Sequence, residues 1–141
     1  MEQNLKNHSR WVLGYHLVLS VATIALLIGS IINVVNSTKE NLYSATLLVL
    51  VAVILLLMFV FIRTFPLKTQ DRAIRAEEKL RYFILTGKAL SSKLTTRQII
   101  GLRFASDEEL VALADKAEKE NLSEKAIKLE IKNWKADNYR V

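Results

Sequence analysis

Two long apolar stretches occupy most of the first half of the chain. The first runs from Trp11 to Val35 and the second from Leu42 to Ile62, and neither contains a formally charged residue. At about 1.5 Å of rise per residue, an α-helix over either stretch can cross a hydrocarbon core of roughly 30 Å. The polar residues 36–41 between them suffice only for a tight turn. The pattern therefore predicts two antiparallel transmembrane helices that form a hairpin.

A cleaved signal peptide is the alternative for the first stretch. Such a peptide has an apolar region of roughly 7–15 residues followed by a small-residue cleavage site. The stretch that begins at Trp11 is longer, and no Ala-x-Ala pattern follows it. We therefore interpret it as an uncleaved anchor, which starts with two aromatic residues, Trp11 and Tyr15, at the level of the headgroups.

The rest of the chain carries dense helix signals and no sustained alternation typical of strands. A first tail helix is predicted from about Leu67 to Leu85, opened by Pro66 and closed by Gly87. We expect an all-α protein in which a transmembrane hairpin precedes a small bundle of about four helices. Its predicted parts are an N-terminal tail at 1–10, spans at 11–35 and 42–62, a turn at 36–41 and a helical domain at 63–141.

Capping residues mark three further helix starts in the tail. Thr95 with Gln98, and Ser106 with Glu109, match capping boxes, and Ser123 is a third N-cap. Asn121 is expected to cap the end of the helix that starts at Ser106. One face of the last helix is predicted to carry Ile127, Ile131 and Trp134.

The charge distribution predicts the orientation in the membrane. The 141-residue chain has a net charge of +6, and residues 63–103 contain ten Lys or Arg against three acidic residues. Lys6 and Arg10 precede the first span, whereas Lys39 is the one basic residue of the turn. Because basic residues are retained on the cytoplasmic side, both termini are predicted to be cytoplasmic.

A basic stripe follows the second span at helical spacing, and its members are Arg63, Lys68, Arg72, Arg75 and Lys79. A neighbouring arc of the same predicted helix is apolar and contains Ala73, Ala76, Leu80, Phe83 and Ile84. The stripe can be an ordinary positive-inside signal on a solvated face, a contact with anionic lipid headgroups, or a site for a partner.

Small and polar residues recur within the first span. Ala25, Gly29 and Asn33 share one face, which favours close packing on the second span or, alternatively, homo-oligomerisation or docking to another membrane protein. His16 lies near the boundary, where we interpret it as an interfacial residue rather than a proton or ligand site.

The residues needed for catalysis or metal binding do not form a recognisable pattern. The chain has no cysteine, its two histidines belong to no ligand motif, and it has no glycine-rich phosphate loop. Asp107, Glu108 and Glu109 are better explained as residues of a helix start than as metal ligands. We expect a protein that is not an enzyme and holds no cofactor or metal.

Four segments carry a resemblance to a known family: KNHSR at 6–10, QDRAIRAEEKLRYFILTGK at 70–88, LTTRQIIGLRFASDEEL at 94–110 and IKNWKADNYRV at 131–141. They resemble a family of short bacterial membrane proteins of unknown function. The resemblance implies a location in the bacterial inner membrane, and no activity follows from it.

The preferred functional hypothesis is a membrane-anchored helical interaction module, which serves as an accessory or scaffold subunit of a larger membrane assembly. Its expected partners are membrane lipids, through the basic stripe, and a protein or a second copy of the chain. The expected partner surface consists of Phe104, Leu110, Trp134 and Tyr139. One alternative is a small oligomeric transport or channel component assembled through Ala25, Gly29 and Asn33. Another is a membrane-tethered nucleic-acid binder, which the acidic balance of the far tail disfavours.

Overall fold

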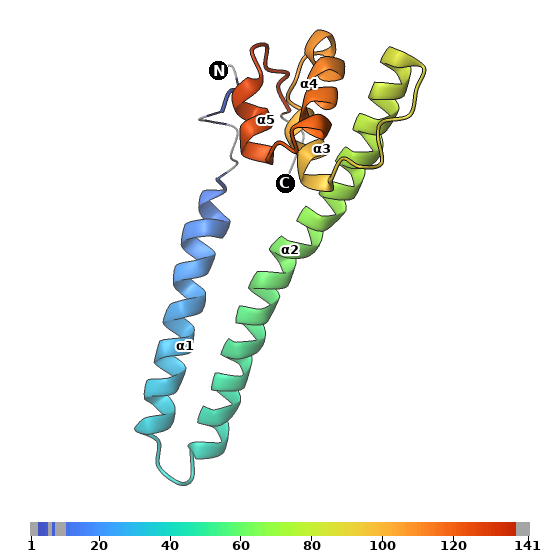
Figure 1. The fold of residues 1–141 in the computed structure, drawn as a ribbon. Coiled ribbons are helices and arrows are strands. Elements are labelled where there is room, and N and C mark those ends of the chain that lie inside the picture. The colour runs from blue at the N-terminus through green and yellow to red at the C-terminus, as the bar shows by residue number, and fades with distance from the viewer. Residues whose placement is uncertain (1–2, 6, 8–10, 138–141) are drawn as a thin grey trace. The chain divides into compact units, whose positions relative to one another are not determined.

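The structure is a computed structural model that describes residues 3–5, 7 and 11–137. Its described residues form helices and no strand, and the expected all-α class is confirmed at this level (Figure 1). The helices are η1 (Gly14–Leu19), α1 (Ser20–Val35), α2 (Leu42–Thr86), α3 (Thr96–Leu102), α4 (Asp107–Lys119) and α5 (Glu124–Glu130). The chain divides into two compact units. One unit is Trp11–Pro66, and the other combines Met1–Arg10 with Leu67–Val141.

The unit Trp11–Pro66, called the apolar unit below, contains a first helix that begins as a π-helix, η1, and continues as α1. Together they run over Gly14–Val35, and this helix and α2 are each long and apolar enough to cross a membrane. Only 11% of the most apolar window of each helix is buried. Two helices suited to lipid are therefore present, and nearly all of their apolar surface faces outward.

Small side chains, rather than large ones, are buried in the apolar unit. Thr23 and Ser30 are buried on α1, and Ala45 and Ala52 are buried on α2, each pair seven residues apart. The hydroxyl of Thr23 donates to the carbonyl of Leu19 at 2.7 Å, and Ser30 bonds its own helix in the same way. Because their hydroxyl groups are satisfied within the helix, both residues can lie at a close contact without an unpaired polar group.

A polar contact accompanies this burial. The phenol of Tyr15 donates a hydrogen bond of 2.6 Å to the backbone carbonyl of Phe59. The rings of the same two residues stack with centroids 4.5 Å apart. Tyr15 is thereby fixed at one end of the apolar unit, where its hydroxyl has a partner.

Helix α2 continues through Pro66, so the expectation that Pro66 opens a separate helix is wrong. Proline lacks the N–H that would bond the carbonyl four residues earlier, here that of Ile62, and this loss costs about 3 kcal/mol in a helix interior. Helical residues on both sides maintain the remaining hydrogen bonds. The end of α2 agrees with the prediction, because Gly87 follows it with a φ of +69°.

The unit that contains the tail, called the tail unit below, has a core of large apolar side chains. The loop after α2 leads back to α3, and α3, α4 and α5 lie close together (Figure 1). Phe104, Leu110 and Ile127 are at most 1% exposed at its centre. A Cβ added at Gly101 of α3 would lie 3.2 Å from the carbonyl oxygen of Glu124, so glycine permits the close approach of α3 to α5.

The predicted helix starts of the tail are largely confirmed. Thr95 and Gln98 form a capping box, and Ser123 accepts a hydrogen bond from the N–H of Ala126. Ser106 is the N-cap of α4, but its side chain makes no cap hydrogen bond, so the second capping box is wrong. Asn121, just beyond α4, has a φ of +48°, the left-handed conformation that ends a helix.

The last helix is shorter than predicted, because α5 ends at Glu130 and Trp134 lies beyond it. Tertiary hydrogen bonds replace helical ones there. The N–H of Lys135 donates to the carbonyl of Phe104 at 2.8 Å, and an isolated antiparallel bridge joins Ala105 to Trp134. These bonds hold the segment after α5 in an extended conformation against the tail core.

Candidate functional site

The basic stripe lies at the surface. Lys68, Arg72, Arg75 and Lys79 are all exposed on the part of α2 that belongs to the tail unit. Arg63 is half-buried and belongs to the apolar unit. None of these four side chains takes part in an ion pair among the described residues. Arg75 donates a hydrogen bond of 3.5 Å to the hydroxyl of Thr96.

The apolar arc beside the stripe is also exposed. Leu80 is 60% exposed, Phe83 53% and Ile84 71%. The opposite side of the same helix is occupied, since Ile74 and Glu78 are buried. The tail core thus uses one face of α2 and leaves a second apolar face uncovered.

The expected partner surface is largely wrong. Phe104 is 0% exposed and Leu110 is 1% exposed, so both are core residues and cannot present a surface. Trp134 is partly buried, with its ring centroid 5.0 Å from that of Phe104. Tyr139 lies outside the described residues. Phe104, Leu110 and Trp134 thus build the core of the tail.

The small-residue stripe of the first span is exposed. Ala25, Gly29 and Asn33 all face outward, and a Cβ added at Gly29 would meet nothing within 4 Å. The small buried residues of α1 are Thr23 and Ser30 instead. Packing within the chain therefore does not use the predicted stripe, and its use by a second protein stays a prediction.

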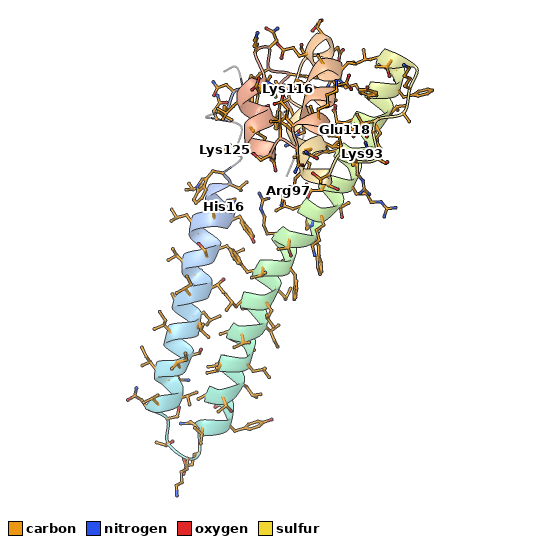
Figure 2. All side chains as sticks on the ribbon, in the orientation of Figure 1. His16, Lys93, Arg97, Lys116, Glu118 and Lys125 are labelled. Carbon is orange, nitrogen blue, oxygen red and sulfur yellow. The ribbon has the colours of Figure 1, made fainter. Side chains whose placement is uncertain are left out.

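His16 lies among aromatic rings, and Figure 2 labels it on the first helix. Its ring stacks on that of Trp11 with centroids 4.5 Å apart, and Tyr15 meets it edge-on at 5.1 Å. Its Nδ1 lies 3.0 Å from the carbonyl oxygen of Val12. These contacts give the ring local partners, and the interfacial position of His16 stays a prediction.

Arg81 links three segments of the tail unit, which the sequence did not suggest. Its guanidinium donates to Asp107 at 2.6 Å, to the backbone carbonyl of Ala105 at 2.7 Å and to Glu78 at 3.0 Å. The hydrogen bond from Arg81 and the positive charge beside it lower the pKa of the Asp107 carboxyl. Arg81 therefore ties α2 to the start of α4 and is not part of the exposed basic stripe.

Two of the three acidic residues at the start of α4, Asp107 and Glu109, have structural partners. Glu109 accepts hydrogen bonds from the N–H groups of Lys132 and Asn133 at 3.1 and 3.2 Å. Within the described residues no group of three or more His, Cys, Asp or Glu side chains is placed to hold a metal ion. The arrangement supports a structural role for these carboxylates.

The N-terminal segment contacts the end of the described chain. The side-chain amide of Gln3 accepts from the N–H of Asp137 at 2.7 Å and donates to its carbonyl at 3.2 Å. Asp137 in turn forms an ion pair of 3.2 Å with Arg103. No local sequence pattern could have revealed this contact, because it joins residues at opposite ends of the chain.

Lysine and glutamate side chains form ion pairs on the surface of the outer helices of the tail. Figure 2 labels Lys93 beside Glu118, and the two form an ion pair of 3.3 Å. Lys116 pairs with Glu130 at 3.0 Å, and this partner raises the pKa of Lys116. A pocket of about 280 Å³ lies against α4 and is lined by Glu108, Glu109, Ala112, Leu113, Lys116, Glu130 and Lys132. The far tail thus presents a mixed-charge surface.

Comparison with known protein families assigns the chain to one of them. A family described as "Family of unknown function (DUF6526)" matches residues 1–141. The chain belongs to this family. The DUF6526 match extends over both apolar stretches and the whole tail, which confirms the expected membership in a family of unknown function. No curated protein and no solved structure matches the chain.

Proposed function

We propose that this DUF6526 chain is a two-span anchor of the bacterial inner membrane whose cytoplasmic tail binds a protein partner, as an accessory or scaffold subunit of a membrane assembly. The distribution of exposed side chains supports the anchor. Large apolar residues such as Leu50 and Val35 are 53% and 77% exposed on the apolar unit. A soluble protein would bury most of such helices, whereas a bilayer stabilises them in this state.

The observation that carries the proposed topology is the contact between the two ends of the chain. Gln3 and Asp137 share hydrogen bonds, and both belong to the tail unit. A chain that leaves this unit at its N-terminus and returns to it at Leu67 must cross a membrane an even number of times. Two candidate spans in a hairpin satisfy this condition, and the basic stripe favours the cytoplasmic side for both termini.

The surface of the tail favours binding over catalysis. The carboxylates of α4 stabilise the fold, and the described tail offers a mixed-charge surface with one large exposed leucine on α5, Leu129, at 62%. Partner binding through the outer side of α4 and α5 replaces the surface expected from Phe104 and Leu110. The rim charges Lys116 and Glu130 would orient a partner more than add affinity.

The topology can be tested with single-cysteine variants, because the natural chain has no cysteine. We expect Lys39→Cys in the turn to react with a membrane-impermeant maleimide in intact spheroplasts. Leu129→Cys in the tail should react only after lysis. Labelling of Leu129→Cys in intact spheroplasts would contradict the proposed orientation, and release of the chain by alkaline carbonate would contradict the anchor.

Partner binding can be tested with a photo-crosslinking amino acid in intact cells. Ala112 lines the α4 pocket and Leu129 is exposed on α5, so both positions should yield one discrete adduct with another protein. Leu50 on the second span is the matched control and should not yield that adduct. An adduct of twice the mass of the chain indicates a homo-oligomer, and no adduct from either tail position contradicts an interaction module.

A further inference from the structure

The exposed apolar arc on the tail segment of α2, residues 67–86, follows the spacing of a coiled-coil seam. Ala73, Ala76, Leu80 and Phe83 are separated by three, four and three residues, and all four are exposed. Leu80 is 60% exposed and Phe83 53%. Residues alternately three and four apart occupy the a and d positions of a heptad, written abcdefg, where two supercoiled helices pack on each other. The segment therefore carries an exposed seam that extends over two heptads.

The core of the tail unit uses the opposite side of this segment. Ile74 and Glu78, at heptad positions b and f, are 7% and 9% exposed. Leu80 and Phe83 do not belong to the buried core cluster. A second helix can thus pack along the seam without any change in the core.

The charges beside the seam match those of a second copy of the chain. Arg72 lies at the g position that precedes Ala73, and Glu77 lies at the e position that follows it. In a parallel two-stranded coiled coil, g and e residues at this spacing face each other across the seam. Arg72 of one copy then faces Glu77 of the other, and twofold symmetry forms the pair twice. Within the part of the chain that the structure describes, neither side chain takes part in an ion pair.

Charge also selects the parallel direction of the two helices. In an antiparallel pair the g positions face each other, so Arg72 and Lys79 would meet the same cations of the other copy and be repelled. In a parallel pair Lys79 faces Ile84 instead, which can pack on the apolar stem of the lysine. Two copies anchored in one membrane are also parallel, but the direction follows here from the charges alone.

Glu77 distinguishes a second copy from other occupants of this face. An anionic membrane or an acidic protein would attract the exposed cations Arg72 and Lys79, but it would repel the carboxylate on the other edge of the seam. A second copy supplies an acid for Arg72 and a base for Glu77 at the same time. Charge complementarity therefore favours self-association.

We propose that residues 67–86 of α2 pair with the same segment of a second copy in a parallel dimer with twofold symmetry. The four apolar residues defined above form the seam, and Arg72 donates hydrogen bonds to Glu77 of the other copy. Alanine at the first two seam positions lets the helices approach closely, while Leu80 and Phe83 lose apolar surface to water on association. Because the helix is already formed, association does not carry the cost of nucleating it.

This dimer goes beyond the partner binding proposed above, because its surface is separate from the outer side of α4 and α5. The exposed ion pair between Arg72 and Glu77 determines register and direction more than affinity. Apolar contact along the seam supplies the stability of the dimer.

Disulfide formation between two copies of the full chain tests the seam, because the natural chain has no cysteine. Ala76→Cys places a thiol at a d position, where the two backbones are close enough for a disulfide. Arg75→Cys, the matched control, places a thiol on the neighbouring exposed residue at position c, outside the seam. After mild oxidation in detergent, we expect Ala76→Cys to give a severalfold higher yield of cross-linked dimer than Arg75→Cys.

Charge reversal in the Ala76→Cys background tests the ion pair. Arg72→Glu and Glu77→Arg each place like charges across the seam, and each should lower the yield of dimer severalfold. The double variant places opposite charges there again and should restore the yield to nearly that of Ala76→Cys alone. Positions 72 and 77 lie about 140° apart around one helix, so this rescue cannot come from a contact within one copy.

Other results overturn the proposal. Equal yields from Ala76→Cys and Arg75→Cys would show random collision without a seam, and a double reversal as low in yield as the single ones would exclude the parallel register. A photo-crosslinking residue in place of Leu80 should give an adduct of twice the mass of the chain in cells. An adduct with another protein, or with lipid alone, assigns the face to that occupant instead. The membrane anchor is measured separately by carbonate extraction and can stand when the dimer fails.

Discussion

The apolar unit and the tail unit place the same types of side chain on opposite sides. In the apolar unit the buried positions are Thr23, Ser30, Ala45 and Ala52, while most leucine, isoleucine and valine side chains face outward. In the tail unit Phe104, Leu110 and Ile127 are inside, and charged residues in ion pairs lie outside. The contrast is accounted for if the two units fold in different solvents.

The difference also shows how each unit gains its stability. In water, burial of a large apolar side chain contributes roughly 1.5–3 kcal/mol, so large residues belong inside the tail. In lipid that gain is absent, and close van der Waals contact of small residues stabilises helix association. Alanine at position 52, 0% exposed, is therefore the counterpart in the apolar unit of phenylalanine at position 104 in the tail.

The largest expected effect is the loss of the central aromatic side chain of the tail. Phe104→Ala should lower the free energy of unfolding of the tail by about 3–5 kcal/mol, because it leaves a cavity and removes the contact with Trp134. Denaturant unfolding of the full chain in detergent, followed by Trp134 fluorescence in a Trp11→Phe background, measures it. Leu129→Ala is the exposed control and should change the midpoint little. Equal effects of both variants would show that the tail lacks the described core.

A charge on the outward face of a span should have the next largest effect. Leu50→Arg places a cation at an outward-facing position that the proposed anchor puts in lipid, and it should disfavour insertion by about 2.5–3.5 kcal/mol. Leu129→Arg makes the same change at similar exposure in the tail and should be nearly neutral. The fraction of chain that resists carbonate extraction compares the two. The proposed difference in solvent is wrong if Leu50→Arg inserts as well as the natural chain.

Two glycines allow a finer comparison between the units. Gly101→Ala places a Cβ 3.2 Å from the carbonyl of Glu124 and 3.3 Å from Ile127, and this crowding should outweigh the better helix propensity of alanine by about 1 kcal/mol. At Gly29 an added Cβ meets open space, so Gly29→Ala should leave the stability of the single chain unchanged.

The same experiment extends to the exposed stripe of the first span. If Ala25, Gly29 and Asn33 contact a second chain, Gly29→Leu should abolish an oligomer that Gly29→Ala only weakens. Sedimentation in detergent measures the oligomer, and thermal unfolding followed by Trp134 fluorescence measures the effect at Gly101. A Gly101→Ala variant more stable than the natural chain would contradict the close approach of α3 to α5.

Local signals in the sequence predict several of the helix ends of the tail. The capping box of Thr95 and Gln98, the N-cap Ser123 and the left-handed residues Gly87 and Asn121 each act within a few residues of the end they mark. Such features depend on backbone and side-chain geometry within a few residues, so one sequence reveals them. The two apolar stretches were equally clear, because length and the absence of charge suffice.

The contacts that assemble each unit were beyond the sequence. Along a span most positions are apolar or small, so the periodic contrast that marks a buried face is weak. The sequence therefore favours Ala25, Gly29 and Asn33 as the packing face, whereas Thr23 and Ser30 are the buried residues. In the tail the pattern identified apolar faces but not what they contact.

For this reason the sequence predicts Phe104 and Leu110 at a partner surface, although they form the core. Arg81 with Asp107 and Gln3 with Asp137 are separated by 26 and 134 positions, and only the folded chain brings them together. Pro66 was expected to start a helix, but helical residues on both of its sides compensate for the missing N–H.

Acid should lower the stability of the tail unit gradually and leave the helices of the apolar unit intact, and this is the smallest of the expected effects. Arg81 lowers the pKa of Asp107, and hydrogen bonds from Ser91 and Lys93 lower that of Glu118, so both carboxylates stabilise the folded tail when ionised. Each contribution is fully present above the pKa of the unfolded chain, about 4 for these groups, and is lost as the pH falls through the lower folded value. Trp134 fluorescence should therefore report a progressive loss of tail stability below about pH 4. Asp107→Asn should flatten this dependence in part.

The stretches 11–35 and 42–62 contain no carboxylate, so far-ultraviolet circular dichroism should retain their helical signal at the same pH. Simultaneous loss of both signals in acid would show that the two units do not differ in what stabilises them.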